Sequence, residues 1–216
     1  MDPAAAIPTP VDVDSIRRRT ERYWFEDGLA ELAVGVTFVV LAGLFSLEAW
    51  LPPASPWRGI SAIGLPIVTI GGYFAARWLI GRLKQDITYP RTGRVAYRQP
   101  DPRQQRVAGA MAALVAAALA FAIVRAPAIE PWTPALAGAA LAALLAQFWL
   151  RFGLARFAGL AMAALGTGLV AGRWLTPLEA AMAAVFGVVG CLMLATGATT
   201  LRGYLRAAPA PTGASE

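Results

Sequence analysis

The sequence contains no histidine and a single cysteine, and charged residues make up only 15% of its 216 residues. Without histidine, the chain lacks the commonest metal ligand and the commonest general base at neutral pH. The lone thiol, Cys191, can form neither an internal disulfide nor a thiolate metal cluster. No phosphate-binding glycine motif or nucleophile elbow stands between a strand and a helix. We therefore predict no catalytic, metal-binding or cofactor-binding residue, and a protein that is not an enzyme.

Apolar residues dominate what is present. They make up 57% of the chain, and the mean hydropathy is +0.55. Soluble domains carry about 25% charged residues, whereas apolar windows of about 20 residues, long enough to cross a bilayer, recur along this chain. We predict an all-α integral membrane protein with six transmembrane helices, arranged as three antiparallel hairpins in a membrane domain of residues 15–206. The predicted spans are residues 29–51, 59–83, 107–124, 135–150, 155–172 and 178–201.

Three polar segments lie outside the predicted spans. The tails, residues 1–14 and 207–216, are rich in proline and lack hydrophobic periodicity, which predicts disorder. The loop 84–106 contains two β-prone stretches around Pro90-Arg91-Thr92-Gly93. Proline suits the first central position of a turn, and glycine suits the left-handed position that closes a hairpin loop. We therefore predict a small cytoplasmic β-hairpin over residues 87–98, which needs support from a neighbour because two strands alone are marginal in water.

The positive charges are distributed unevenly between the two sides of the predicted bundle. Sixteen of the 19 basic residues fall in the N-terminal segment, the region 77–106, the turn 151–156 and the C-terminal segment, and three fall on the other side. Positive charge stays in the cytoplasm, so both termini and the central loop are predicted to be cytoplasmic. The preference for arginine and alanine indicates a GC-rich bacterial genome, and hence a bacterial inner membrane. Basic residues placed this way favour anionic lipid headgroups as partners and do not indicate nucleic acid.

Two recurring patterns bear on helix ends and packing. Each predicted outer turn ends in a hydroxyl residue followed by proline, which is typical of an N-cap and the first helical position: Ser55-Pro56, Thr133-Pro134 and Thr176-Pro177. Small residues four apart predict close helix approach, within the chain or in a homo-oligomer: Gly168 with Gly172, and Ala183 with Gly187.

An acidic cluster, Glu26, Asp27 and Glu31, begins the first span. The helix macrodipole favours negative charge there. Pairing with arginines of the central loop, or a proton or ion site, would use the same residues. We expect the hairpin to dock against residues 23–31, through aromatic packing and an arginine–carboxylate contact. The candidate residues for this cytoplasmic interaction site are Trp24, Glu26, Asp27, Glu31, Tyr89, Arg91, Arg94, Tyr97 and Arg98.

A resemblance to a known group of proteins rests on two stretches of the sequence: RYWFEDGLAEL at residues 22–32 and ITYPRTGRVAYR at residues 87–98. The chain resembles a family of uncharacterised bacterial multi-pass membrane proteins. In these, an aromatic-acidic segment precedes the first span and a Tyr-Pro-Arg-Thr-Gly turn follows the second. The resemblance implies a membrane location and no known activity.

Three functions fit these patterns. We expect a non-enzymatic accessory or scaffold subunit that contacts a membrane-protein partner through its cytoplasmic face. A small-solute transporter would instead need a polar cavity at mid-depth, built from Thr37, Thr69, Thr167 and a kink at Pro66. An integral membrane enzyme would need a pocket at the inner interface that joins Glu26, Asp27 or Glu31 to Arg91, Arg94 or Arg98.

Overall fold

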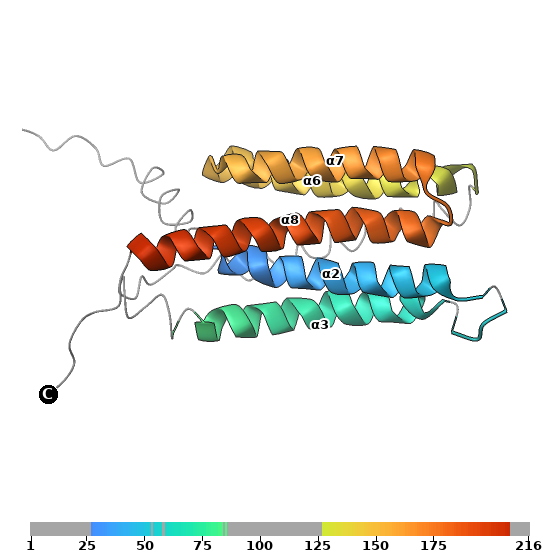
Figure 1. Cartoon of the computed structure of the whole chain (residues 1–216), viewed down its shortest axis with the longest axis horizontal. Coiled ribbons are helices and arrows are strands. Elements are labelled where there is room, and N and C mark those ends of the chain that lie inside the picture. The colour runs from blue at the N-terminus through green and yellow to red at the C-terminus, as the bar shows by residue number, and fades with distance from the viewer. Residues whose placement is uncertain (1–26, 53, 58, 84, 86–126, 208–216) are drawn as a thin grey trace, which may run out of the picture.

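The computed structural model describes residues 27–52, 54–57, 59–83, 85 and 127–207. Five long helices run side by side through this part of the chain (Figure 1): α2 (Leu29–Trp50), α3 (Ile60–Leu83), α6 (Thr133–Phe152), α7 (Ala155–Trp174) and α8 (Leu178–Ala207). A short 3₁₀ helix, η2 (Pro127–Trp132), leads into α6. Each long helix is long and apolar enough to cross a membrane. The prediction of a helical membrane protein is therefore confirmed for these residues, none of which forms a strand.

The predicted and observed span boundaries can be compared for five of the six spans. Four of them agree to within about two residues at each end. The third predicted span, 107–124, and the predicted hairpin, 87–98, lie outside the described residues. Helix α8 differs most, because it continues to Ala207 instead of ending at Leu201. At 1.5 Å per residue its 30 residues extend about 45 Å, so α8 is longer than the roughly 30 Å apolar core of a bilayer.

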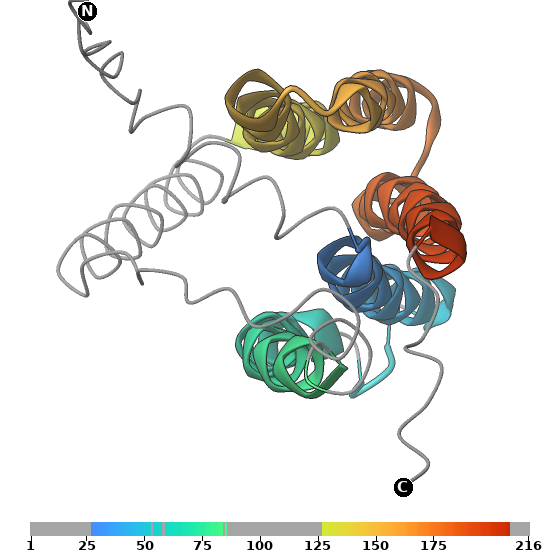
Figure 2. The same ribbon diagram turned by 90° about the vertical axis from the view of Figure 1, so that its left-hand side faces the viewer.

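The closest helix packing does not follow the predicted hairpins. The most extensive contacts join α2 to α8 and α6 to α7, whereas the predicted partners α2 with α3 and α7 with α8 contact each other less. The end-on view shows α8 between α2 and the α6–α7 pair, with α3 at the edge of the bundle (Figure 2). The first and the last described helices thus form the main contact of the bundle.

Glycine explains why α2 and α8 lie so close. Gly28 and Gly35 on α2 face Gly197 and Gly190 on α8, respectively. The glycines are seven residues apart on each helix, a spacing that keeps them on one face. A Cβ atom added at Gly28 would lie 2.5 Å from the carbonyl oxygen of Gly197, so the two backbones meet without intervening side chains.

A second glycine contact joins α6 to α7. A Cβ atom on Gly138 would lie 2.5 Å from the carbonyl oxygen of Ala164 and 2.9 Å from the Cα atom of Gly168. Gly172, the other half of the predicted motif, faces the carbonyl oxygen of Pro131. Contacts within one chain therefore account for this motif, and it supplies no argument for a homo-oligomer.

The predicted arrangement, a hydroxyl N-cap followed by proline at the first helical position, is wrong at all three turns. Helix α3 begins at Ile60, well after Pro56, and the hydroxyl of Ser55 accepts a hydrogen bond from the N–H of Trp57 instead. Helix α6 has Trp132 as its N-cap, without a side-chain cap. The reason is that η2 runs directly into α6, so a preceding helical turn occupies the place of a cap. At the third turn α8 begins at Leu178, where the predicted span also begins, so Pro177 precedes the helix instead of occupying its first position.

Tryptophans mark both ends of the bundle. Trp50, Trp57, Trp132 and Trp174 are exposed at one end, and Trp78 and Trp149 are exposed toward the other. Tryptophan prefers the interface between the apolar core and the headgroups of a bilayer. The two groups therefore fit the two faces of a membrane.

Candidate functional site

Most described basic side chains lie at one end of the bundle, which we call the arginine-rich end. There α2 and α7 begin, and α3, α6 and α8 finish (left-hand side of Figure 1). The described arginines in the half of the bundle toward this end are Arg77, Arg82, Arg151, Arg156, Arg202 and Arg206, whereas Arg173 lies at the opposite end. Within the described residues, the charge asymmetry expected from the sequence therefore corresponds to one end of a helix bundle.

An ion pair connects two helices at this end. The Nε atom of Arg156, at the start of α7, lies 2.6 Å from Oε1 of Glu31, in the first turn of α2. The side chain of Glu31 is 2% exposed and that of Arg156 is 22% exposed. The second oxygen of Glu31, Oε2, is buried and has no hydrogen-bond partner. The pair is therefore largely shielded from solvent, and Arg156 is the positive charge that neutralises Glu31.

The helix period explains why Glu31 is buried. Glu31 comes three residues after Gly28 and four before Gly35, so it shares the face of α2 that packs on α8. The hydroxyl of Thr196 on α8 lies beside its carboxylate. That hydroxyl is also within 3.0 Å of the carbonyl oxygen of Leu192 in its own helix. Glu31 thus occupies the point where α2, α7 and α8 meet.

Asp27 has a more local role. Its side chain is fully buried, and its Oδ1 atom accepts a hydrogen bond of 3.1 Å from the backbone N–H of Leu29. Gly28 follows in the left-handed conformation, with φ 72°, and its carbonyl oxygen accepts the N–H of Leu32. Asp27 therefore stabilises the first turn of α2, as the macrodipole argument predicts.

Only two of the nine sequence-predicted interaction residues, Asp27 and Glu31, lie in the described part of the chain. Trp24, Glu26, Tyr89, Arg91, Arg94, Tyr97 and Arg98 fall outside it, so docking of the hairpin against residues 23–31 stays a prediction. Arg156 was not among the candidates. Its one signal is its place in a short, two-arginine turn on the side predicted to be cytoplasmic.

A second buried carboxylate, Glu48, lies at the opposite end of α2. Its Oε1 atom accepts a hydrogen bond of 2.7 Å from the N–H of Gly59, and Oε2 is buried without a partner. The N–H of Leu51 bonds to the backbone carbonyl of Glu48. Glu48 therefore connects the turn before α3 to the end of α2 and stabilises the fold there.

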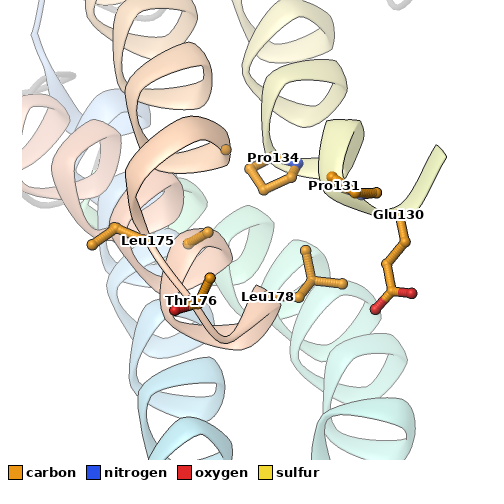
Figure 3. A pocket seen from close by; sticks show the side chains of 8 residues that line it. Glu130, Pro131, Pro134, Leu175, Thr176 and Leu178 are labelled. Atoms are coloured by element: carbon orange, nitrogen blue, oxygen red, sulfur yellow. The ribbon is translucent and has the colours of Figure 1, made fainter. Parts of the chain in front are cut away.

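A small cavity lies at the same end, away from Glu31. Its volume is about 190 Å³, and its walls come from η2, the beginning of α6, the end of α7 and the beginning of α8 (Figure 3). The lining is apolar apart from Glu130 and Thr176. This cavity does not include the arginine–carboxylate pair that the enzyme hypothesis requires.

The threonines of the transporter hypothesis do not converge in the described helices. The hydroxyl of Thr37 donates to the carbonyl of Ala33 within α2, and its methyl group faces Gly72 of α3. Thr69 is exposed on α3, and Thr167 lies on α7. Helix α3 is continuous through Pro66.

No protein-family model, no curated protein and no solved structure matches this chain. The function must therefore be inferred from the sequence and the geometry of the chain. Among the described residues the three buried acids, Asp27, Glu31 and Glu48, bind an arginine or a backbone N–H group, an arrangement that joins and caps helices.

Proposed function

We propose that the protein is a non-enzymatic accessory or scaffold subunit of a membrane assembly, acting through its arginine-rich end. The observation that supports this proposal is that the buried acids have partners within the protein, whereas two arginines at the same end are exposed. Glu31 and Asp27 hold helices in place, while Arg202 and Arg206 are exposed one turn apart at the projecting end of α8. Because α8 is longer than the bilayer core, this pair extends toward the headgroups and beyond. An exposed basic pair on a rigid helix fits an acidic surface of a partner protein.

The proposal includes six spans with both termini in the cytoplasm. Helix α3 ends at the arginine-rich end, and η2 begins at the opposite end (Figure 1). Because these two points lie at opposite ends, we propose that the chain between residues 83 and 127 crosses the bundle length once more. The apolar stretch 107–124 is long enough for one crossing. The arginine-rich end then faces the cytoplasm by the positive-inside rule, in the inner membrane of a bacterium.

Reporter fusions test this topology. A reporter enzyme that is active only in the periplasm is expected to be inactive when fused after Ala207 or after Gly153. The same reporter fused after Pro127 should be active, because η2 lies at the opposite end. The reverse pattern would invert the orientation. Equal activity after Pro127 and Gly153 would contradict the crossing by α6.

Site-specific photo-cross-linking tests the partner. A photoreactive amino acid at Gly203, an exposed position where a Cβ atom would meet nothing within 4 Å outside its own helix backbone, is expected to cross-link a discrete protein in intact cells. The matched control places the same amino acid at the exposed Trp174, at the opposite end, where no such product should form. Replacing Arg202 and Arg206 by serine should reduce the Gly203 product severalfold at unchanged protein level. Equal products at both positions, or transport of a solute by the protein alone in liposomes, would refute the scaffold function.

A further inference from the structure

Helix α3 has the most exposed surface of the five described helices. It packs on α2 through Gly64 and Gly72, and among the described residues no other helix has extensive contacts with it. Ile67, Phe74 and Trp78, spaced by seven and four residues, form one exposed stripe along it. In a membrane this stripe faces lipid chains.

The stripe ends at an arginine with an unusual neighbour. The guanidinium carbon of Arg82 lies 4.7 Å from the centroid of the Trp78 ring, one helical turn earlier. Arg151, Arg156 and Arg173 also lie near aromatic rings, but each contacts the residue next to it in sequence, at 5.5 Å. Residues four apart share a helix face, whereas adjacent residues do not. Arg82 and Trp78 are therefore directed to the same side, toward lipid.

Stacking prepares Arg82 for a particular ligand. A guanidinium group that lies on an aromatic ring keeps its N–H donors free at its edge, where they match the oxygens of a phosphate. Arg82 is exposed, and no described acidic residue forms an ion pair with it. Its charge thus lacks a protein counter-ion among the described residues, at the depth where phosphate groups of lipids begin.

We propose that Arg82, Trp78 and the stripe below them form a binding site for an anionic phospholipid. Arg82 binds the phosphate, Trp78 holds the guanidinium in place, and the acyl chains lie along Phe74 and Ile67. The exposed apolar stripe directly beneath the cation is the reason to choose a lipid over a soluble phosphate. The site uses neither Arg202 nor Arg206, the two arginines proposed to contact a protein partner.

Native mass spectrometry of the delipidated full-length protein tests the proposal. Dioleoylphosphatidylglycerol is titrated against dioleoylphosphatidylcholine, which has the same chains and no net charge. We expect preferential binding of phosphatidylglycerol, lowered about tenfold by Arg82→Gln and about twofold to fivefold by Trp78→Leu. Arg173→Gln is the matched control, because it removes one exposed arginine beside a tryptophan at the opposite end, and it should leave binding unchanged.

Three results would overturn the site. These are equal binding of the two lipids, wild-type affinity in both Arg82→Gln and Trp78→Leu, or an equal loss in Arg173→Gln. Competition by millimolar glycerol phosphate, the headgroup without chains, separates the two sources of phosphate. Displacement of the lipid by glycerol phosphate would show a site for a soluble anion and refute the lipid proposal. Because both substitutions are on an exposed face, the melting temperature of each variant should match that of the wild type.

Discussion

Replacing Arg156 by methionine is expected to lower the free energy of unfolding by about 3–5 kcal/mol, the usual loss when one partner of a buried ion pair is removed. Methionine keeps most of the apolar length of the side chain but leaves the carboxylate of Glu31, which is 2% exposed, without its cation. Thermal unfolding in detergent, followed by the fraction of protein that stays monodisperse, provides the measurement.

The pattern across a set of variants distinguishes a true pair from a generally sensitive turn. Glu31→Leu combined with Arg156→Met should be more stable than Arg156→Met alone, because the double variant buries no unpaired charge. Arg151→Met, on the other side of the same turn, is the control. It is expected to lose about 1 kcal/mol or less, since Arg151 is exposed. Strict additivity of the Glu31 and Arg156 effects would mean that the two side chains do not interact.

The second large effect is expected at Gly138. Valine there would place its Cβ atom 2.5 Å from the carbonyl oxygen of Ala164 and 2.9 Å from the Cα atom of Gly168. Both obstacles are backbone atoms, which cannot move aside as a side chain can, so α6 and α7 would have to separate. Overpacking typically costs 1–3 kcal/mol and occasionally more. We expect a loss of about 3 kcal/mol or more, or no folded protein at all.

Gly166→Val on α7 is the matched control, because no atom lies within 4 Å of a Cβ atom at that position. The two variants change the same residue type on two helices that pack together, and only one faces the partner helix. Both can be compared by their yield after extraction and by their melting temperature in one detergent. If Gly166→Val were as unstable as Gly138→Val, the close α6–α7 contact would not explain the loss.

The sequence predicts the helices well and their partners poorly. Span limits follow from composition, so the beginnings of α2, α7 and α8 could be read directly. The end of α8 could not, because the prediction stopped at the first charge, Arg202. Leucine, arginine and alanine are good helix formers, so the helix continues past this charge to Ala207. The pairing of α2 with α8 depends on four glycines: Gly28, Gly35, Gly190 and Gly197. Their seven-residue spacing predicts that they share one face of each helix, but it does not predict which helix packs against that face.

For the candidate site, the sequence likewise predicts a residue but not its partner. Glu31 was predicted from its place in an acidic cluster at a helix start. Its partner was sought in the segment with the most arginines, whereas the structure supplies Arg156, 125 residues away, from a turn with two. The number of charges in a segment indicates which side of a membrane it occupies. It contains no information about which helix ends lie side by side.

The contact between α2 and α8 also has a consequence for how the protein is made. These helices are the first and last of those described, and about 130 residues separate the end of one from the beginning of the other. At a synthesis rate of about 5–20 residues per second, α2 waits roughly 6–25 s in the membrane before its main partner is synthesised. During that interval its glycine face lacks its final contact, and the carboxylate of Glu31 lacks its cation until Arg156 at the start of α7 has been made. Until α8 has been made, the glycine face of α2 must be covered by lipid, by the insertion machinery or by the helices between α2 and α8. In a chain that stops before Leu178 this face would never pack against α8.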